Sequence, residues 1–352
     1  MAIDGNTGAS RRDDYRATFL EGRVSNPPNR VASKTRLQYD ARMRHSSIPT
    51  RPFGRTGIPV SILALGGWHL GLPKTDAAAT RLAHAAIDAG ITFLDNAWDY
   101  NDGLSEARMG KAIHDRRDQV FLMTKVCTHG RNGKVAMKQL EQSLKRLRTD
   151  YLDLWQIHEV VFDDEPARHF APGGVVEALD RAREQGKVRF VGFTGHKEPR
   201  LHLEMLAHDY QWDACQLPLN CFDATFRSFE QQVVPELTRR GIAVIGMKSF
   251  GGDGRALKKK IVTPKEALSY AMSLPVATLV SGIGTPGVLK QNVAIARGFR
   301  PMTEKQREAL RRRVAGPAAD GRFELYKVSA LFEGDEARRV HGLPTHAEEL
   351  ML

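Results

Sequence analysis

Four polar side chains, those of Asp95, Tyr100, Lys125 and His158, could together form an acid–base centre. Tyrosine is a weak acid with a pKa of about 10, and a nearby ammonium group such as that of Lys125 stabilises its phenolate. Asp95 could keep this ammonium charged and oriented, and His158 could hydrogen-bond a substrate oxygen. Such a centre is suited to giving a proton to a carbonyl oxygen while a hydride adds to the carbonyl carbon.

Each of these residues also has a purely structural interpretation. Tyr100 could be an ordinary loop residue, and His158 could be a hydrogen-bonded core histidine. Asp95 and Lys125 could form an ion pair that only stabilises the fold. The catalytic interpretation depends on placement, because all four residues follow short apolar runs, and Asp95 and Tyr100 are separated by only four residues.

The elements that must position these side chains alternate between strand-like and helix-like patterns. Short apolar runs predict eight strands, and an amphipathic helical pattern follows each of them. The strands are expected at 60–65, 91–95, 120–126, 151–158, 188–193, 212–217, 242–247 and 276–283, and the helices at 76–89, 104–115, 134–148, 174–185, 198–208, 228–239, 264–273 and 287–297. Eight such units predict an α/β fold, a closed (β/α)8 barrel, with its chemistry at the carboxyl ends of the strands. A doubly wound sheet would need a reversal point and usually has fewer strands.

The chain is expected to divide into three parts. Residues 1–48 are rich in Arg, Asn, Ser and Pro without sustained periodicity, which predicts a poorly ordered extension or an arm on a partner. Residues 49–315 form the predicted barrel, which opens with a hairpin at 51–60 and ends with an extra helix at about 303–314. Residues 316–352 are expected to form a tail packed on or near the barrel.

The composition is typical of a soluble globular protein. Of the 352 residues, 41% are hydrophobic, and no run approaches the roughly 20 apolar residues that span a bilayer. The net charge is +11, and residues 1–50 supply part of it, with nine Lys/Arg against five Asp/Glu. The basic runs 258–260 and 311–313 have no interleaved aromatic residues. We therefore expect a solvated basic surface and no nucleic-acid partner.

The cysteines indicate a reducing compartment. Cys127, Cys215 and Cys221 form no CxxC motif and no disulfide framework, and no Cys/His spacing indicates a metal site. The pair Arg11–Arg12 is similar to a twin-arginine signal, but no apolar core follows it. We therefore expect a cytoplasmic protein without a metal.

The segments that carry the four polar residues resemble the aldo-keto reductase family. The matching motifs are FLDNAWDYNDGLSEARMGKAI, FLMTKV and LDLWQIH, and the resemblance extends from about 51 to 292. It includes the hairpin, which in the family plugs the barrel floor. The resemblance implies NAD(P)H-dependent reduction of an aldehyde or ketone to an alcohol. It implies that Tyr100 is the general acid and that Lys125 lowers its pKa. It also implies that Asp95 supports Lys125 and that His158 orients the carbonyl.

The resemblance extends to the cofactor site, where NADP(H) is favoured and NAD(H) is possible. Gln216 matches the family glutamine that holds the nicotinamide carboxamide, and the glycines after Met247 would let the backbone approach a pyrophosphate. The expected cofactor-binding residues are Gly67, Trp68, Asp95, Thr194, Gly195, Gln216, Met247, Lys248, Ser249, Phe250, Gly251, Gly282, Gly284, Thr285, Gln291 and Asn292.

Two departures from the family pattern lie near the expected nicotinamide. Thr194-Gly195 stands where the family has Ser-Asn, so a side-chain amide is missing, and His196 could replace it. Met247 stands where many members have an aromatic ring that stacks on the nicotinamide. Because methionine is apolar and polarizable, it could still cover that ring.

A third departure concerns the 2′-phosphate that distinguishes NADP from NAD. Gly282 and Val288 stand where well-studied members have a Lys and an Arg for this phosphate. The basic clamp is therefore incomplete. Lys290, Arg297 or the run 258–260 could substitute for it.

The sequence leaves the substrate open. The 159–173 loop and the tail could shape the substrate pocket, and a small-molecule carbonyl or alcohol is the expected partner, with a homo-oligomer possible. One alternative is a cofactor-binding regulatory or structural subunit with little turnover, similar to potassium-channel β subunits. Another is a barrel isomerase or hydrolase, which the lack of metal ligands and of an activated nucleophile disfavours.

Overall fold

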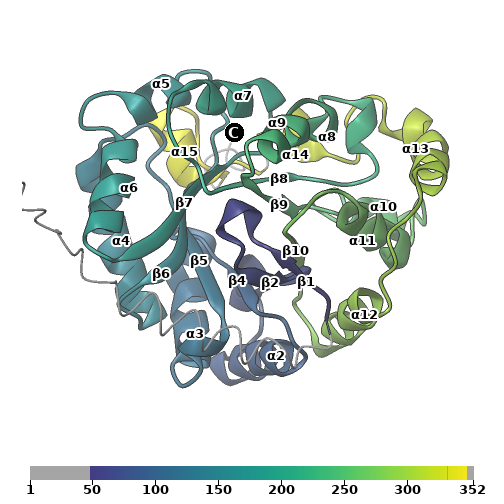
Figure 1. The fold of residues 1–352 in the computed structure, drawn as a ribbon, viewed down its shortest axis with the longest axis horizontal. Coiled ribbons are helices and arrows are strands. Elements are labelled where there is room, and N and C mark those ends of the chain that lie inside the picture. The colour runs from purple at the N-terminus through teal and green to yellow at the C-terminus, as the bar shows by residue number, and fades with distance from the viewer. Residues whose placement is uncertain (1–47, 331, 347–352) are drawn as a thin grey trace, which may run out of the picture.

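A closed barrel of eight parallel strands forms the centre of the molecule (Figure 1). The structure, a computed structural model, describes residues 48–330 and 332–346, so most of the extension expected at 1–48 lies outside the described residues. Each barrel strand pairs with its neighbour in the chain, and β10 closes the barrel by pairing with β3. The predicted (β/α)8 fold is therefore confirmed.

The strands fall close to the apolar runs that predict them. The barrel strands are β3 (Leu63–Gly66), β4 (Phe93–Asp95), β5 (Phe121–Val126), β6 (Leu152–Ile157), β7 (Val188–Thr194), β8 (Ala214–Pro218), β9 (Ala243–Met247) and β10 (Thr278–Gly282). Nearly all of their residues are buried, because the barrel interior covers one face and the helices cover the other. One apolar cluster, which includes Phe93, Phe121 and Leu154, fills the interior, and a larger one lies between strands and helices.

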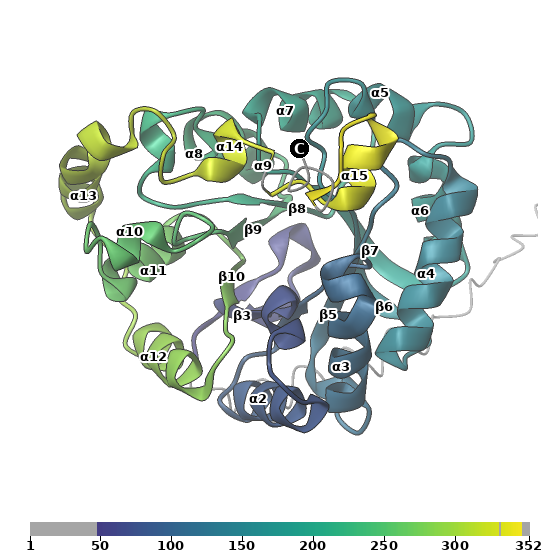
Figure 2. The ribbon, with the colours of Figure 1, turned by 180° about the vertical axis from the view of Figure 1, so that it is seen from behind.

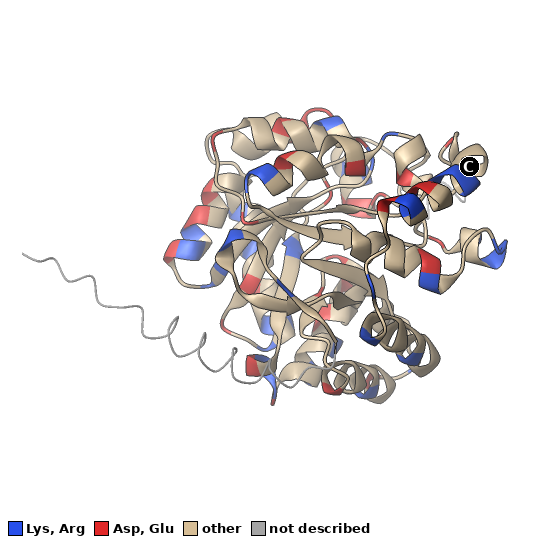
Figure 3. Ribbon diagram, turned by 45° about the vertical axis from the view of Figure 1, so that its right-hand side comes forward, with Lys and Arg blue, Asp and Glu red and all other residues tan. Residues whose placement is uncertain are grey.

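The helices form the outer ring, with both signs of charge interspersed over their surfaces (Figure 3). The helices that follow the strands are α2 (Asp76–Asp88), α3 (Leu104–Ile113), α4 (Gly133–Leu147), α6 (Val175–Glu184), α7 (Pro199–Ala207), α8 (Phe229–Gln232), α9 (Val234–Arg239), α11 (Pro264–Ser273) and α12 (Pro286–Arg297). The extra helix α13 (Glu304–Ala318) follows α12. Short helices α5 (Glu165–Phe170) and α10 (Arg255–Lys258) lie in loops. Among the described residues, we find no helix with the length and apolar character needed to cross a membrane.

One predicted helix is wrong in detail. The pattern over 228–239 predicts a single helix, but the structure has two, α8 and α9, which meet at Val233. Pro235 stands in the first turn of α9. Proline has no backbone N–H and its ring crowds the preceding turn, so Pro235 fits the start of a new helix better than the middle of a continuous helix over 228–239.

The predicted N-terminal hairpin closes one end of the barrel. Strands β1 (Thr50–Pro52) and β2 (Pro59–Ser61) pair antiparallel, and the 3-10 turn η1 (Gly54–Thr56) joins them. Phe53 is fully buried, with its ring 4.7 Å from that of Phe121 in the barrel interior. Arg55 anchors the turn by hydrogen bonds to the Trp212 carbonyl and to Asp213. The amino ends of the strands are thus sealed, and ligand access is left to the opposite end.

The C-terminal segment lies at that opposite end. Beyond α13 the chain forms two short helices, α14 (Leu325–Val328) and α15 (Asp335–Val340). Figure 1 shows the hairpin at the near end of the barrel, and the view from behind in Figure 2 shows α14 and α15 in front. The carboxyl ends of the strands, with the polar residues that follow them, therefore lie beneath this segment.

Candidate active site

The barrel brings the four predicted catalytic residues together. Asp95 is the last residue of β4, Lys125 lies on β5, and His158 directly follows β6. Tyr100 opens the 3-10 turn η3 (Tyr100–Gly103), five residues after the end of β4. All four lie at the carboxyl ends of three neighbouring strands, where barrel enzymes place their chemistry.

Lys125 is the centre of this group. Its ammonium donates hydrogen bonds to Asp95 Oδ1 at 2.5 Å and to the Asn96 carbonyl at 2.7 Å, and it lies 3.3 Å from the Tyr100 hydroxyl. The Lys125 side chain is 1% exposed, and that of Asp95 is 4% exposed. A buried charge is stable only when a partner compensates it. Asp95 therefore compensates the charge of Lys125 and holds its ammonium beside the hydroxyl.

Tyr100 keeps its proton at neutral pH. Burial and the nearby carboxylates of Asp95 and Asp99 raise the pKa of Tyr100 well above its ordinary value. The Lys125 ammonium favours the phenolate, as the sequence predicts, but the net direction is upward. Tyr100 therefore carries its proton at neutral pH, and the Lys125 ammonium lies close enough to interact with its hydroxyl. The turn after it is strained, since Asn101 and Asp102 have φ of 54° and 56°, and such strain is common at functional sites.

His158 has neighbours that the sequence did not reveal. Its Nδ1 atom lies 3.2 Å from Cys127 Sγ and 3.4 Å from Asp99 Oδ1, and its Nε2 atom lies 3.8 Å from Glu159 Oε2. Burial tends to raise the pKa of Asp99, but the adjacent His158 holds it well below its usual range, so Asp99 is a carboxylate at neutral pH. The Asp99 carboxylate is therefore an anionic neighbour of the His158 ring, although its Oδ1 atom has no hydrogen-bond partner among the described residues. The His158 ring meets the Tyr100 ring edge-on, with centroids 5.6 Å apart.

The three residues Asp99, Cys127 and His158 bear on the expectation that the protein has no metal site. The sequence spacing indicates no metal site, yet Asp99, Cys127 and His158 bring one potential ligand atom each to within 4.8 Å of one another. Burial raises the pKa of the Cys127 thiol, so Cys127 is protonated without a metal. The three residues come from different strand ends, which is why no local spacing motif reveals them.

The expected nicotinamide residues lie on adjacent strands. Thr194 ends β7 and is in register with Gln216 of β8, and both are buried. Gln216 accepts a hydrogen bond from Gln156 at 2.9 Å. A side chain at Gly195 would meet the Val160 carbonyl at 2.4 Å, so this backbone has no room for the asparagine of the family. The missing amide is therefore a consequence of local packing.

The expected pyrophosphate loop is packed against the C-terminal segment. A Cβ atom at Gly251, which has φ of 76°, would lie 2.1 Å from the Phe323 carbonyl, and one at Gly252 would lie 3.0 Å from the Phe332 ring. These two glycines are thus required for the packing of the C-terminal segment, a second reason for them beside the predicted approach to a pyrophosphate. Met247 ends β9, and Lys248, Ser249 and Phe250 follow it.

The segment 282–292, which holds several of the expected cofactor-binding residues, also has structural roles. Thr285 caps α12 by accepting from the Val288 backbone, and Asn292 donates to Ser281 at 3.0 Å. A Cβ atom at Gly282 would lie 2.2 Å from the His69 ring, so the family lysine does not fit while His69 holds this position. His69, which lies in the 3-10 turn η2 (Gly67–Gly71), was not among the residues expected from the sequence.

Other expected cofactor positions lie around this segment. Gly67 packs against the Asp95 carbonyl, and Trp68 is 46% exposed. Gln291 lies on α12 next to Asn292, outside the barrel interior. A groove of about 340 Å³ beside Gly284 is lined by Pro73, Ala78, Arg81, Leu82, Ala85, Gly284 and Pro286. None of the four catalytic candidates lines this groove, and its lining places Arg81 beside Gly284 and Pro286.

The loop after β6 and the C-terminal segment meet over the strand ends. The rings of Phe162 and His341 stack with centroids 3.6 Å apart, and Gly334 N donates to Glu159 Oε1 at 2.9 Å. Lys197, which follows β7, is ion-paired with Glu333. The 159–173 loop, expected to shape the substrate pocket, is thus bound to the tail that was expected to reach the active site.

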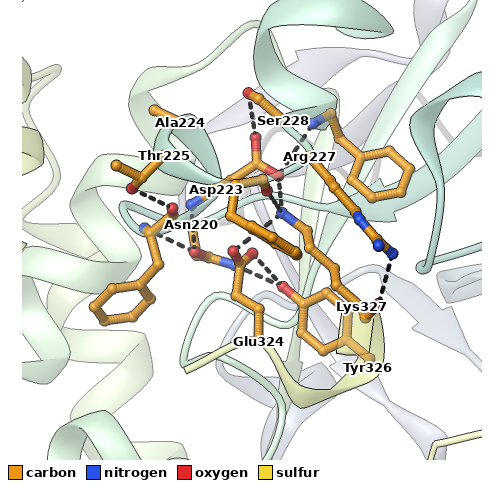
Figure 4. A network of polar contacts seen from close by, with 12 residues as sticks. Asn220, Asp223, Ala224, Thr225, Arg227, Ser228, Glu324, Tyr326 and Lys327 are labelled. Atoms are coloured by element: carbon orange, nitrogen blue, oxygen red, sulfur yellow. Dashed lines mark hydrogen bonds and ion pairs between the residues drawn. The ribbon is translucent and has the colours of Figure 1, made fainter. Parts of the chain in front are cut away.

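A buried network fixes the start of this segment (Figure 4). Lys327 is fully buried and donates to Asp223 at 2.7 Å and to Glu324 at 3.0 Å. The Tyr326 hydroxyl donates to Glu324 at 2.6 Å and accepts from Asn220 at 2.9 Å. Because Asn220 and Asp223 follow β8, the network joins the C-terminal segment to the barrel end that carries Gln216.

Comparison with known proteins agrees with this geometry. The sequence pattern described as "Aldo/keto reductase family" matches residues 62–266. The 6-dehydroglucose reductase of Novosphingobium aromaticivorans is 30% identical over 245 residues, which are 64% of this chain and 78% of that protein. This chain therefore belongs to the aldo/keto reductase family, a family of oxidoreductases.

Solved structures share the fold. The holo form of an aldo-keto reductase from Bacillus halodurans superimposes with a TM-score of 0.64 and 24% identity, covering 76% of this chain and 96% of that one. An aldo/keto reductase from Klebsiella pneumoniae, solved in complex with NADP and acetate, gives a TM-score of 0.61 and 24% identity, with 76% and 95% coverage.

Proposed function

We propose that this protein reduces an aldehyde or ketone to an alcohol by hydride transfer from a nicotinamide cofactor, with Tyr100 as the general acid. One observation carries the proposal: the Lys125 ammonium lies at once 2.5 Å from Asp95 and 3.3 Å from the Tyr100 hydroxyl. Family membership supports the reaction class. The name of the 6-dehydroglucose reductase supports a carbonyl substrate.

The residues at this end of the barrel fit a nicotinamide cofactor. Nε2 of the buried His196 has no hydrogen-bond partner among the described residues, and the Lys248 ammonium has no carboxylate within 4.0 Å among them. Such groups suit a ligand that carries amide and phosphate groups. Thr194 and Gln216 would hold the carboxamide, and Met247 would cover the ring. The bound cofactor supplies the hydride.

The chain itself supplies position and protons. His158 donates a hydrogen bond to the substrate carbonyl oxygen, with Asp99 holding its ring. As the carbonyl carbon gains the hydride, negative charge develops on the oxygen, and Tyr100 transfers its hydroxyl proton to it. Lys125 stabilises the phenolate that remains, and Asp95 keeps Lys125 charged. The product is the neutral alcohol, and Tyr100 recovers its proton from water.

NADP(H) is the favoured cofactor, with NAD(H) possible. The Klebsiella pneumoniae relative binds NADP. In this chain Gly282 and Val288 do not supply the family's basic pair, so His69 and Arg81, which lie beside the same segment, are the candidates to contact a 2′-phosphate. Fluorescence titration with NADPH and NADH tests this choice. Tighter NADPH binding that is lost in Arg81→Ala or His69→Ala supports it, and equal affinities contradict it.

The proposal is tested by cofactor oxidation with a panel of aliphatic and aromatic aldehydes and ketones. We expect Lys125→Met to abolish oxidation while cofactor binding persists. Lys305→Met, at an exposed position on α13, serves as the matched control. Cofactor binding without oxidation of any carbonyl by the wild-type protein would instead favour a regulatory subunit.

A further inference from the structure

Lys248 is a largely buried cation without a counter-ion. It follows β9 in a strained conformation with φ of 54°, and its ammonium is close enough to Lys125 and Asp95 to feel their charges. This ammonium lies 5.3 Å from the centre of the Tyr326 ring and 3.8 Å from Met247 Sδ. In the described part of the chain, no carboxylate lies within 4.0 Å of it. A buried charge without a partner is costly, and such sites are commonly functional.

The fully buried lysines of this region are neutralised. Lys125 has Asp95 at 2.5 Å, and Lys327 has Asp223 at 2.7 Å. The charge of Glu159 acts on Lys248, but Glu159 forms no ion pair with it within 4.0 Å, and its Oε1 atom accepts a hydrogen bond from Gly334 N at 2.9 Å. Lys248 therefore differs from these two lysines, because no carboxylate among the described residues lies within ion-pair distance of it.

A second polar group without a partner lies beside the same ring. His196 is 2% exposed, and its Nε2 atom has no hydrogen-bond partner among the described residues. The His196 ring meets the Tyr326 ring edge-on, with centroids 5.9 Å apart. Buried imidazole nitrogens are normally hydrogen-bonded. Two groups that can each donate to an anion therefore converge on Tyr326.

The Tyr326 ring lies beside both Lys248 and His196 and is held in place by hydrogen bonds. Figure 4 shows its hydroxyl held by Glu324 and Asn220 in the network that anchors the C-terminal segment. Its ring also meets that of Phe332 edge-on at 6.0 Å. An aromatic face stabilises an adjacent ammonium and still leaves the other sides of that ammonium free. The Tyr326 ring thus contacts the Lys248 ammonium without neutralising its charge.

We propose that Lys248 and His196 form a subsite for an anionic group, a carboxylate or a phosphate, beside the catalytic residues. The inference rests on the proposed function and deepens it, because the anion belongs either to the carbonyl substrate or to the cofactor. A carboxylate on the substrate would make acid-bearing aldehydes or ketones the preferred class. A charge-assisted pair of this kind is strong where water is excluded.

The charge of Lys248 is compatible with this role. Burial lowers the pKa of Lys248 to about 8, with Glu159 and Asp95 opposing the decrease and Lys125 adding to it. Burial also lowers the pKa of His196 well below its usual range, so His196 is neutral at pH 7 and acts through a hydrogen bond. Lys248 is then mostly charged at pH 7, and a bound anion stabilises the charged form further.

The test uses Lys248→Met, with Lys248→Arg to restore the charge and Lys305→Met as the matched exposed control. Binding of 4-carboxybenzoate and of inorganic pyrophosphate is measured by calorimetry without turnover, and NADPH binding by fluorescence. In parallel, kcat/KM is compared for benzaldehyde and 4-carboxybenzaldehyde. We expect Lys248→Met to weaken one of these anions about tenfold to a hundredfold, and Lys248→Arg to recover part of the loss.

The outcomes separate the two sources of the anion. A loss confined to 4-carboxybenzoate and 4-carboxybenzaldehyde assigns the subsite to the substrate. A loss confined to pyrophosphate and NADPH assigns it to the cofactor. Unchanged binding of all these probes, or an equal loss of kcat for both aldehydes with all binding unchanged, overturns the proposal. If Lys248-dependent anion binding persists in a protein that oxidises no cofactor, the subsite stands and the reductase function falls.

Discussion

The Lys125 ammonium lies 3.3 Å from the Tyr100 hydroxyl while it is bound to Asp95 at 2.5 Å. One lysine thus joins Tyr100, the proposed proton donor, to Asp95, the carboxylate that pairs with the lysine. Burial and nearby carboxylates raise the pKa of Tyr100, so the proposed mechanism requires the lysine to stabilise the phenolate during proton release. Each part of this arrangement can be tested separately.

Removing the ammonium should affect both stability and turnover. Lys125→Met leaves Asp95 buried without its partner, and breaking a buried pair in this way costs about 3–5 kcal/mol of the free energy of unfolding. The double variant Lys125→Met/Asp95→Asn should regain part of that stability but no turnover. Urea denaturation and cofactor oxidation measure the two effects. Turnover by the double variant close to the wild-type value would contradict a catalytic role for the pair.

Asp99 should position His158. Asp99→Asn removes a carboxylate 3.4 Å from His158 Nδ1, and we expect kcat/KM for a carbonyl to fall about tenfold as the ring loses its orientation. The pH dependence of kcat/KM should also change, which a purely structural role would not produce. Asp102→Asn, in the same turn, is the control. An unchanged pH profile and rate in Asp99→Asn would exclude this role.

The network of Figure 4 should hold the C-terminal segment on the barrel. Lys327→Met leaves Asp223 and Glu324 as buried carboxylates without their cation, so the free energy of unfolding should fall by about 3–5 kcal/mol. Limited proteolysis should then cut the chain after α13 sooner than in the wild type. Lys305→Met should alter neither measurement. A Lys327→Met protein with unchanged stability and cleavage would show that the network does not anchor the segment.

Two buried histidines should make the fold sensitive to acid. Burial lowers the pKa of His169 and of His202 to about 4. Between pH 6.5 and pH 4 the unfolded chain therefore binds more protons at these sites than the folded chain. Stability falls as the pH falls through this range, by at most about 3 kcal/mol for each histidine.

This sensitivity is measured by urea denaturation between pH 7 and pH 4. His202→Leu should make the free energy of unfolding less dependent on pH, whereas His114→Leu, at an exposed position, should leave the dependence unchanged. An identical pH dependence in His202→Leu and wild type would show that His202 does not contribute to it.

The sequence predicts the barrel because strand and helix patterns are local, and each strand end carries its polar residue with it. The apolar runs alone therefore place Asp95, Lys125 and His158 at the strand ends. They do not predict the neighbours of His158, since Asp99 and Cys127 reach it from different strands and no spacing motif connects them. The catalytic roles of these residues stay predictions until the variants are measured.

The departures from the family pattern have tertiary causes. No local pattern shows that the Val160 carbonyl leaves no room for a side chain at Gly195, or that the His69 ring fills the space beside Gly282. The break between α8 and α9 could have been anticipated from Pro235. The position of Tyr326 could not have been anticipated in this way, because its partner Asn220 lies 106 residues earlier in the chain.

The most direct test of the central claim compares Tyr100→Phe with the wild type. Tyr151→Phe, a tyrosine just before β6, is the control. NADPH binding is followed by fluorescence, and NADPH oxidation is then measured with a panel of aldehydes and ketones. We expect the wild type and Tyr151→Phe to bind and oxidise NADPH, and Tyr100→Phe to bind it with oxidation reduced about 100-fold to 10,000-fold. Oxidation by Tyr100→Phe at the wild-type rate would contradict the role of Tyr100 as the general acid.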